Sequence, residues 1–170
     1  MEIVSRSAAE TEGVGEAVGR AMRAWGGEGV VCVALRGGLG AGKTQFARGL
    51  ARGAGVADMG LVSSPTYVLM NEYRAVAGGL TVWHFDAYRV GGADDFAALG
   101  FEELLGGENG PGMVAVEWPE RVEELLPADR LEVEMERGDE ESERLIRLWG
   151  VGKLAALLQR LEVPPAQNRG

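Results

Sequence analysis

Eight consecutive residues, 37–44, combine glycines with a lysine and a threonine in the order Gly-Gly-Leu-Gly-Ala-Gly-Lys-Thr. Glycines 37 and 42 and the closing Lys43-Thr44 satisfy the Walker A pattern, in which glycines let successive backbone N–H groups turn toward a phosphate chain. In this pattern the lysine contacts the β- and γ-phosphates, and the threonine hydroxyl completes the ligand shell of Mg²⁺. The segment therefore predicts a site for a nucleoside triphosphate and magnesium.

Two acidic residues each follow an apolar strand, the position at which P-loop enzymes place the acid that acts on magnesium or water. Glu117 follows the apolar run 113–116, and Asp86 follows the run 82–85. An acid in this place can hold the magnesium shell or orient a water toward the γ-phosphate. Ordinary turn-capping or solvated acids also end strands, so the pattern makes Asp86 and Glu117 candidates for both catalysis and metal binding without separating these roles.

Two further features lie near these acids. Strand alternation places His84 on the same face as Asp86. Since His84 is the only histidine and Cys32 the only cysteine, the usual zinc spacings are missing, and we interpret His84 as a hydrogen-bonded core residue or one that orients the site. The run Ser-Ser-Pro-Thr at 63–66 could form a switch-like loop beside the site, although its residue types slightly favour an ordinary turn.

The elements that position the P-loop follow the order strand, glycine loop, helix. Residues 30–35 are continuously apolar and β-branched, which predicts a strand buried on both faces. Apolar residues from Phe46 to Ala54 recur at helical spacing, and Gly55 ends that helix. A capping box at residues 7–10 opens a first helix over residues 8–25.

The rest of the chain predicts one mixed α/β domain. Further strands are expected at 67–73, 80–88, 113–117, 131–136 and 144–149, and short helices at 94–105, 119–126 and 151–161. Because two pairs of strands follow each other across short turns, we predict a three-layer P-loop NTPase-like fold with a mixed, mainly parallel central sheet. Residues 1–162 are expected to form this P-loop domain, and residues 163–170 are expected to be a disordered C-terminal tail.

Composition excludes several classes of function. The 170 residues are 46% apolar, and no apolar run approaches the roughly 20 residues that span a bilayer, so we expect no membrane anchor. Cys32 is the only cysteine, so no disulfide can form within the chain, which favours a cytoplasmic protein. Because it lies in an apolar run, we interpret it as a small buried hydrophobic residue. A net charge of −9 repels nucleic-acid backbones, so any connection with RNA is expected to be indirect.

Four motifs occur in a fixed order along the chain. They read Leu-Gly-Ala-Gly-Lys-Thr at 39–44, Ser-Pro-Thr-Tyr at 64–67, His-Phe-Asp-Ala-Tyr-Arg at 84–89 and Glu-Trp-Pro-Glu-Arg at 117–121. In this order and spacing they resemble the TsaE family of bacterial tRNA threonylcarbamoyladenosine biosynthesis ATPases. The resemblance implies an ATPase whose activity is weak in isolation. It would work with the partner proteins TsaB and TsaD, which modify the adenosine next to the anticodon, and its ATP hydrolysis would reset the complex with these partners. It would meet tRNA only through that complex.

The resemblance also implies roles for single residues. It assigns Glu117 to the magnesium shell and Asp86 to water positioning or catalysis, with Trp118 close to the nucleotide and Thr11 and Arg144 flanking the base. The residues expected to contact ATP are Thr11, Leu39, Gly40, Ala41, Gly42, Lys43, Thr44, Gln45, Trp118 and Arg144. The expected catalytic residues are Lys43, Asp86 and Glu117, and the expected Mg²⁺ ligands are Thr44, Asp86 and Glu117.

Three other functions use a P-loop and stay open as alternatives. A small-molecule kinase would need a substrate pocket and an arginine-bearing lid, and the sequence contains no clear lid segment. A GTPase switch would carry the guanine-reading Asn-Lys-x-Asp motif, which is absent from the chain. An ATP-dependent interaction module would bind the nucleotide to present a surface, with negligible turnover.

Overall fold

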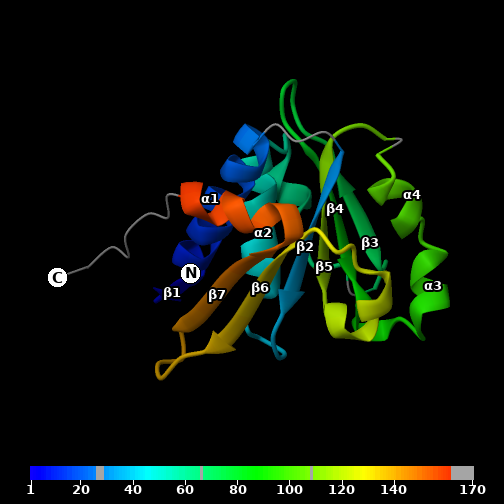
Figure 1. Cartoon of the computed structure of the whole chain (residues 1–170). Coiled ribbons are helices and arrows are strands. Elements are labelled where there is room, and N and C mark those ends of the chain that lie inside the picture. Colours follow the sequence, from blue (N-terminus) through cyan, green and yellow to red (C-terminus); the bar gives the residue numbers. More distant parts are fainter. Residues whose placement is uncertain (26–28, 66, 108, 162–170) are drawn as a thin grey trace.

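A seven-stranded sheet forms the centre of the chain (Figure 1). The computed structural model describes residues 1–25, 29–65, 67–107 and 109–161. Its strands are β1 (Glu2–Ser5), β2 (Val30–Arg36), β3 (Met70–Tyr73), β4 (Thr81–Asp86), β5 (Gly112–Glu117), β6 (Arg130–Arg137) and β7 (Arg144–Val151). Across the sheet they lie in the order β1-β7-β6-β2-β5-β4-β3.

The strands in the middle of the sheet are parallel, and those at its edges are antiparallel. β2 pairs in parallel with β6 and β5, and β5 pairs in parallel with β4. β1, β7 and β3 join the sheet through antiparallel pairs, which confirms that the sheet is mixed. Because parallel strands end at the same edge, the register brings Leu35, Glu117 and Asp86 next to one another on β2, β5 and β4.

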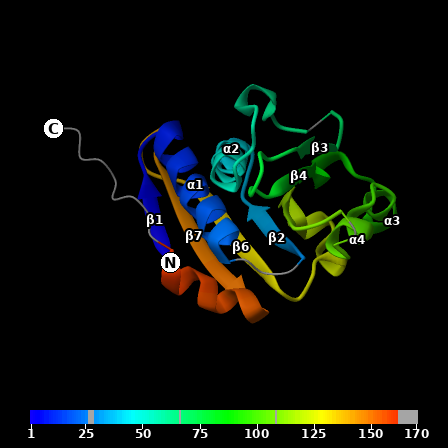
Figure 2. The same ribbon diagram turned by 90° about the horizontal axis from the view of Figure 1, so that it is seen from above.

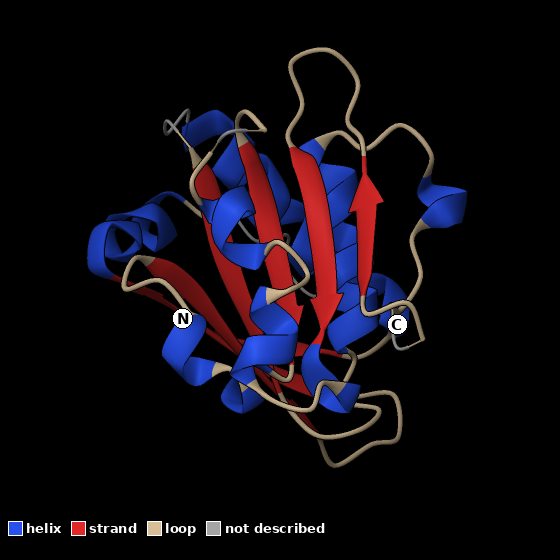
Figure 3. Cartoon of the chain, turned by 90° about the vertical axis from the view of Figure 1, so that its right-hand side faces the viewer, coloured by secondary structure: helices blue, strands red, loops and turns tan. Residues whose placement is uncertain are grey.

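Helices cover both faces of this sheet and confirm the predicted three-layer α/β arrangement (Figure 3). α1 (Ala8–Trp25) and α2 (Lys43–Ala54) lie side by side on one face, and α3 (Ala93–Ala97) and α4 (Phe101–Leu105) lie on the other (Figure 2). No helix in the described part of the chain is both long and apolar enough to cross a bilayer. The 3-10 helices are η1 (Met59–Leu61), η2 (Ala87–Arg89), η3 (Pro119–Arg121), η4 (Glu123–Leu125) and η5 (Gly152–Arg160).

The P-loop strand β2 contributes to the core on each face of the sheet. Val33 and Leu35 pack into the cluster that contains α1 and α2, while Cys32 and Ala34 pack into the cluster that contains α3 and α4. All four side chains are fully buried, as the continuous apolar run predicts. Burial raises the pKa of the Cys32 thiol to about 12, so this cysteine stays protonated and behaves as a small hydrophobe.

Two edge strands differ from the sequence prediction. β1 was not expected, because its four residues are too short to show a pattern, yet it pairs along its whole length with β7. The strand predicted at 67–73 begins only at Met70. The N–H groups of Val68 and Leu69 both bond to the carbonyl oxygen of Pro65, and Leu69 has a φ of 65°, so this part of the chain forms a turn.

The predicted short helices are more broken than expected. The helix at 94–105 is divided into α3 and α4, because Gly100 between them adopts a left-handed φ of 84°. The segments at 119–126 and 151–161 form 3-10 helices rather than α-helices. The strand expected at 80–88 ends at Asp86, where η2 begins. The tail at 163–170 lies outside the described residues.

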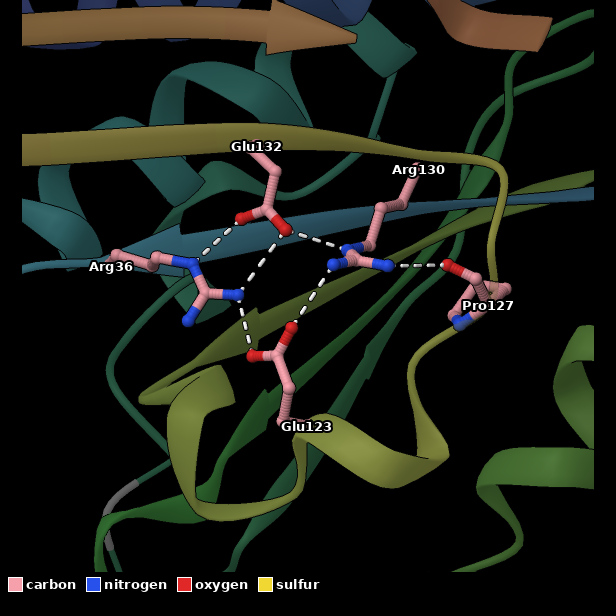
Figure 4. Close-up of polar contacts among 5 residues, drawn as sticks. All are labelled: Arg36, Glu123, Pro127, Arg130 and Glu132. Atoms are coloured by element: carbon pink, nitrogen blue, oxygen red, sulfur yellow. Dashed lines mark hydrogen bonds and ion pairs between the residues drawn. The ribbon is translucent and has the colours of Figure 1, made fainter. Parts of the chain in front are cut away.

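Two arginines and two glutamates form a closed ring that joins β2 and β6 to η4 (Figure 4). Arg36 donates to Glu132 at 2.8 Å and to Glu123 at 2.6 Å, and Arg130 donates to the same two carboxylates at 2.6 and 3.0 Å. Burial by itself raises the pKa of Glu132, but the hydrogen bonds from Arg36 and Arg130 outweigh it and lower that pKa. Since Arg36 directly precedes the P-loop, the ring fixes the entry of the loop relative to the segment that follows β5.

Candidate nucleotide site

The P-loop connects the end of β2 to the start of α2, as the Walker A pattern requires. Gly37, Gly40 and Gly42 have φ values of 137°, 75° and 102°, a conformation that favours glycine. A Cβ at Gly37 would also collide with the backbone of Met135 on β6. The first N–H groups of α2 have no partner within the helix, so its start offers donors and a partial positive charge to an anion.

Lys43 is buried at the first position of α2. Its Nζ donates to the carbonyl oxygens of Gly37 and Gly38 at 2.7 and 3.0 Å, and lies 4.0 Å from the centre of the Trp118 ring. Burial lowers the pKa of the Lys43 amine below its ordinary value, while negative charges including Glu117 act in the opposite direction. The ammonium therefore lies inside the loop that would surround a phosphate chain, with an aromatic face beside it.

Glu117 links the P-loop helix to the neighbouring strands. Its Oε1 accepts a hydrogen bond from Oγ1 of Thr44 at 3.0 Å and lies 2.9 Å from Nε2 of His84. Glu117 and His84 are both buried, with exposed fractions of 4% and 0%. The carboxylate that the sequence offered as a candidate thus contacts the threonine of the Walker A motif directly.

Asp86 lies beside Glu117 at the same edge of the sheet, because the two residues are register partners on β4 and β5. Its Oδ1 accepts a hydrogen bond from the N–H of Tyr88 at 2.9 Å and so caps η2. The capping role that the sequence left open is therefore real, but the side chain is also buried at the end of the central strands. Its catalytic and metal roles stay predictions.

Trp118 follows Glu117 directly and has a left-handed backbone, with φ of 59°. This conformation turns the chain out of β5 into η3 and presents the ring to Lys43. Tyr88 stacks at a tilt against Trp118, with ring centroids 5.0 Å apart. The two motifs at 84–89 and 117–121 therefore meet at one wall of the P-loop.

An open pocket of about 450 Å³ adjoins the P-loop and is lined by four of the residues expected to contact ATP, namely Thr11, Gly42, Gln45 and Arg144. Thr11, Gln45 and Arg144 come from α1, α2 and β7. Arg144 donates to the carbonyl oxygens of Glu141 and Glu143 at 2.8 and 2.7 Å. The lining residues are Ala8, Thr11, Gly42, Gln45, Glu140, Glu141, Ser142 and Arg144.

Some predicted contacts lie outside this pocket. Leu39 is 79% exposed at the tip of the P-loop, and its carbonyl oxygen accepts a hydrogen bond from Arg137 at 3.3 Å. The side chain of Ala41 is buried beneath the loop, and its N–H bonds to the carbonyl of Gly38. Gly40 lies close to the side chain of Arg137. These residues shape the loop, and their contact with a nucleotide stays a prediction.

The segment at 63–66 is anchored at its start. Arg48 on α2 donates to the carbonyl oxygen of Val62 at 2.6 Å, and the hydroxyl of Tyr73 donates to that of Ser63 at 2.8 Å. Thr66, the last residue of this segment, lies outside the described residues. The choice between a switch-like loop and an ordinary turn therefore stays open.

Comparison with known proteins gives a consistent family. The model of the family described as threonylcarbamoyl adenosine biosynthesis protein TsaE matches residues 5–146. The chain belongs to the TsaE family. A TsaE protein of Treponema pallidum is 42% identical over 127 residues, which are 75% of this chain and 84% of that protein. One from Aquifex aeolicus is 36% identical over 148 residues, covering 87% of this chain and 95% of the relative.

A solved structure supports the fold of this TsaE-family chain. The crystal structure of YdiB from Bacillus subtilis superposes with a TM-score of 0.72 at 28% identity, covering 95% of this chain and 93% of YdiB. Both relatives above carry the name tRNA threonylcarbamoyladenosine biosynthesis protein TsaE. The match to YdiB confirms the predicted P-loop NTPase-like fold. The family model and the named relatives confirm the predicted family and its link to this tRNA modification pathway.

The groups around the P-loop of this TsaE-family member fit a hard cation held mainly by phosphate and water. The protein offers the hydroxyl of Thr44 and the carboxylates of Glu117 and Asp86, which are the oxygen donors that magnesium prefers. Among the described residues, no group of three or more His, Cys, Asp or Glu side chains could hold a metal ion alone. That these oxygen donors hold magnesium together with a nucleotide stays a prediction.

Sequence reasoning missed two parts of the site. The sequence predicted that His84 is hydrogen-bonded in the core or orients the site, but its partner, Glu117, depends on the pairing of β4 with β5 and was not identified. The acidic residues Glu140 and Glu141 of the open pocket lie in the turn between β6 and β7, for which no role was predicted from the sequence. His84 and Glu117 each begin one of the four motifs, but the motifs do not show that these two side chains meet, and no motif covers Glu140 and Glu141.

Proposed function

We propose that this TsaE-family chain is an ATPase that hydrolyses ATP with magnesium in complex with TsaB and TsaD, and so resets the transferase between rounds of tRNA modification. The observation that carries the proposal is the 3.0 Å hydrogen bond from Thr44 to Glu117. It joins the last residue of the Walker A motif to an acid on the adjacent strand, which is the pairing that P-loop NTPases use around magnesium. The chain would act in the cytoplasm and meet tRNA only through its partners.

Each residue of the phosphate end has a separate part in this proposal. The start of α2 and the ammonium of Lys43 bind the phosphates, and Thr44 and Glu117 hold the magnesium shell. Magnesium, when bound, supplies positive charge that offsets the charge on the phosphate oxygens. Asp86 would orient a water and accept its proton as the water oxygen bonds to the γ-phosphorus. The bond from that phosphorus to the bridging oxygen would break, and ADP would leave with its electron pair, so that the products are ADP and phosphate.

The open pocket is the proposed site of the base. Thr11, Gln45 and Arg144 line it together with Gly42, which belongs to the P-loop itself, so a molecule in this pocket would adjoin the phosphate site. Trp118 lies beside Lys43 and would contact the nucleotide from the opposite side of the loop. An adenine base follows from the family likeness and from the missing guanine-reading motif.

The test measures ATP hydrolysis by the chain alone, with TsaB, with TsaD and with both. We expect slow hydrolysis alone and a clear increase with the pair, together with threonylcarbamoyladenosine in tRNA that depends on this chain. Lys43→Ala is the negative control, and Lys153→Ala, which changes the other lysine at an exposed position, is the matched control. Unchanged rates with a modification level that ignores the chain would contradict the proposal.

The same experiment separates the alternatives. An interaction module would bind TsaB and TsaD in a nucleotide-dependent way without faster hydrolysis. A small-molecule kinase would consume ATP only when an acceptor metabolite is added, and the partner proteins would not affect its rate.

A further inference from the structure

His84 contacts the carboxylate of the site from inside the sheet. It lies in the middle of β4, where it pairs with Ala115 on β5 and Asn71 on β3, and its side chain is fully buried. Nε2 of His84 lies 2.9 Å from Oε1 of Glu117. The same oxygen accepts the hydroxyl of Thr44, so Glu117 is held by one partner from α2 and one from β4.

With Glu117 as a carboxylate, the Nε2–H tautomer of His84 is the one that forms a hydrogen bond across this contact. A carboxylate oxygen can only accept, so an unprotonated Nε2 would direct its lone pair at the negative charge of Glu117. The Nε2–H form donates instead and gives a charge-assisted hydrogen bond. His84 therefore acts as a donor that fixes the direction of the Glu117 carboxylate.

Packing alone does not explain a histidine at this position. Nδ1 of His84 is buried and has no hydrogen-bond partner within the part of the chain that the structure describes. A buried polar atom without a partner costs stability, whereas an apolar side chain of similar size would fill the same space without that cost. Val82, which lies on the same face of β4 as His84, packs into the apolar cluster with α1 and α2, so an apolar side chain suits this face of the strand.

We propose that His84 is a positioning residue, whose Nε2–H holds Glu117 in the orientation that the magnesium shell requires beside Thr44. The inference rests on the proposed function, because it deepens the role of Glu117 in that site. Partners that orient the carboxylate ligands of metals affect metal affinity or activity by about 10–100-fold when they are changed. His84 would act in the same way, without contact to the nucleotide.

Two substitutions of equal length test the donor. His84→Gln places a side-chain N–H near the position of Nε2, and His84→Met has a similar length and no donor. Each purified full-length variant is titrated with Mg²⁺ at a fixed concentration of a fluorescent ATP analogue. We expect the Met variant to need about tenfold more Mg²⁺ for half-maximal binding, and the Gln variant to stay within about threefold of the wild-type protein.

A thermal unfolding midpoint and the hydrolysis kinetics complete the test. The Met variant removes the unpartnered Nδ1, which favours a higher midpoint, and also the hydrogen bond to buried Glu117, which favours a lower one, so the midpoint shows only the net effect on stability. Measured below the midpoint of each variant, kcat with TsaB and TsaD is expected to fall by about tenfold in the Met variant at unchanged KM for ATP. Equal Mg²⁺ requirements for the Gln and Met variants would overturn the inference. If the wild-type chain shows no partner-stimulated hydrolysis, the proposed function fails, while the Mg²⁺ titration still decides the role of His84.

Discussion

The two ends of the candidate nucleotide site are built in different ways. At the phosphate end, Lys43, Glu117 and His84 are buried, and the carboxylate receives partners from two different elements. At the open pocket, Arg144 bonds to backbone carbonyls of the adjoining hairpin, and the lining residues come from α1, α2 and the β6–β7 hairpin. The first end is part of the core of the sheet, and the second lies on its surface.

This difference separates two properties of the site. Buried charged groups are strongly affected by each other and tolerate little change, whereas exposed polar contacts contribute less to binding. Changes at the phosphate end should therefore affect turnover or phosphate binding strongly. Changes at the open pocket should have small effects that are confined to the affinity for the nucleoside part.

The largest effect is expected when the two acids lose their charge. Glu117→Gln and Asp86→Asn should each lower kcat about a hundredfold or more, while the Kd for nucleotide changes by less than about threefold. The Asn variant can still cap η2 through its side-chain oxygen, so the local backbone is kept. Single-turnover hydrolysis and equilibrium binding measure the two quantities separately.

A loss of binding as large as the loss of turnover in both acid variants would show that the roles assigned at the phosphate end are wrong. If only one of the two acid variants loses turnover, the chemistry belongs to the residue changed in that variant. Thermal unfolding of each variant provides the control for a general loss of structure.

Removal of the buried ammonium should have the next largest effect. Lys43→Ala is expected to raise the Kd for ATP by about 30-fold, which corresponds to roughly 2 kcal/mol for a hydrogen bond to a charged group. Lys153→Ala serves as the matched control, since Lys153 is exposed and pairs only with Asp129 among the described residues. Equal affinities for the two variants would remove Lys43 from the binding site.

The parts of the site that the sequence predicted are those that it encodes locally. The P-loop and the acids Asp86 and Glu117 lie in or directly after apolar strands, so their place at one sheet edge follows from the rule that parallel strands end together. Thr11 and Arg144 are far apart in the chain and entered only through the family resemblance. Their meeting depends on how α1 and β7 pack against the P-loop, which no local pattern records.

The errors in the fold have the same physical origin. β1 is stabilised by its pairing with β7 rather than by its own four residues, and pairing partners cannot be read from so short a segment. The prediction of one helix at 94–105 did not take account of Gly100, whose left-handed conformation divides the segment into α3 and α4. The ring around Glu132 joins three separate elements and has no sequence motif.

The ring of Arg36, Glu123, Arg130 and Glu132 should support the phosphate end through stability rather than through chemistry. Glu132→Gln removes one of its two negative charges and is expected to lower the free energy of unfolding by about 1.5 kcal/mol and Tm by about 3–6 °C at pH 7. The pKa of Glu132 is lowered in the folded state, so its contribution is present above the ordinary glutamate pKa and is lost as the pH falls through the lowered one.

The difference in Tm between the wild-type protein and Glu132→Gln should therefore shrink once the pH falls below about 4.3, the ordinary glutamate value. Thermal unfolding across this range, followed by circular dichroism, measures it. A difference that is constant down to low pH would mean that the charge of Glu132 does not contribute.

The smallest effect is expected at the open pocket, and it sharpens the comparison most directly. Arg144→Ala removes a wall of the pocket and the hydrogen bonds to Glu141 and Glu143, and it should raise the Kd for ATP about fivefold, or roughly 1 kcal/mol, at unchanged kcat. Arg147→Ala is the control on the same strand, because Arg147 forms ion pairs with exposed glutamates instead. An inorganic triphosphate, which lacks a base, should bind the wild-type and Arg144→Ala proteins equally; weaker binding to the variant would place Arg144 at the phosphate end and remove the distinction between the two halves of the site.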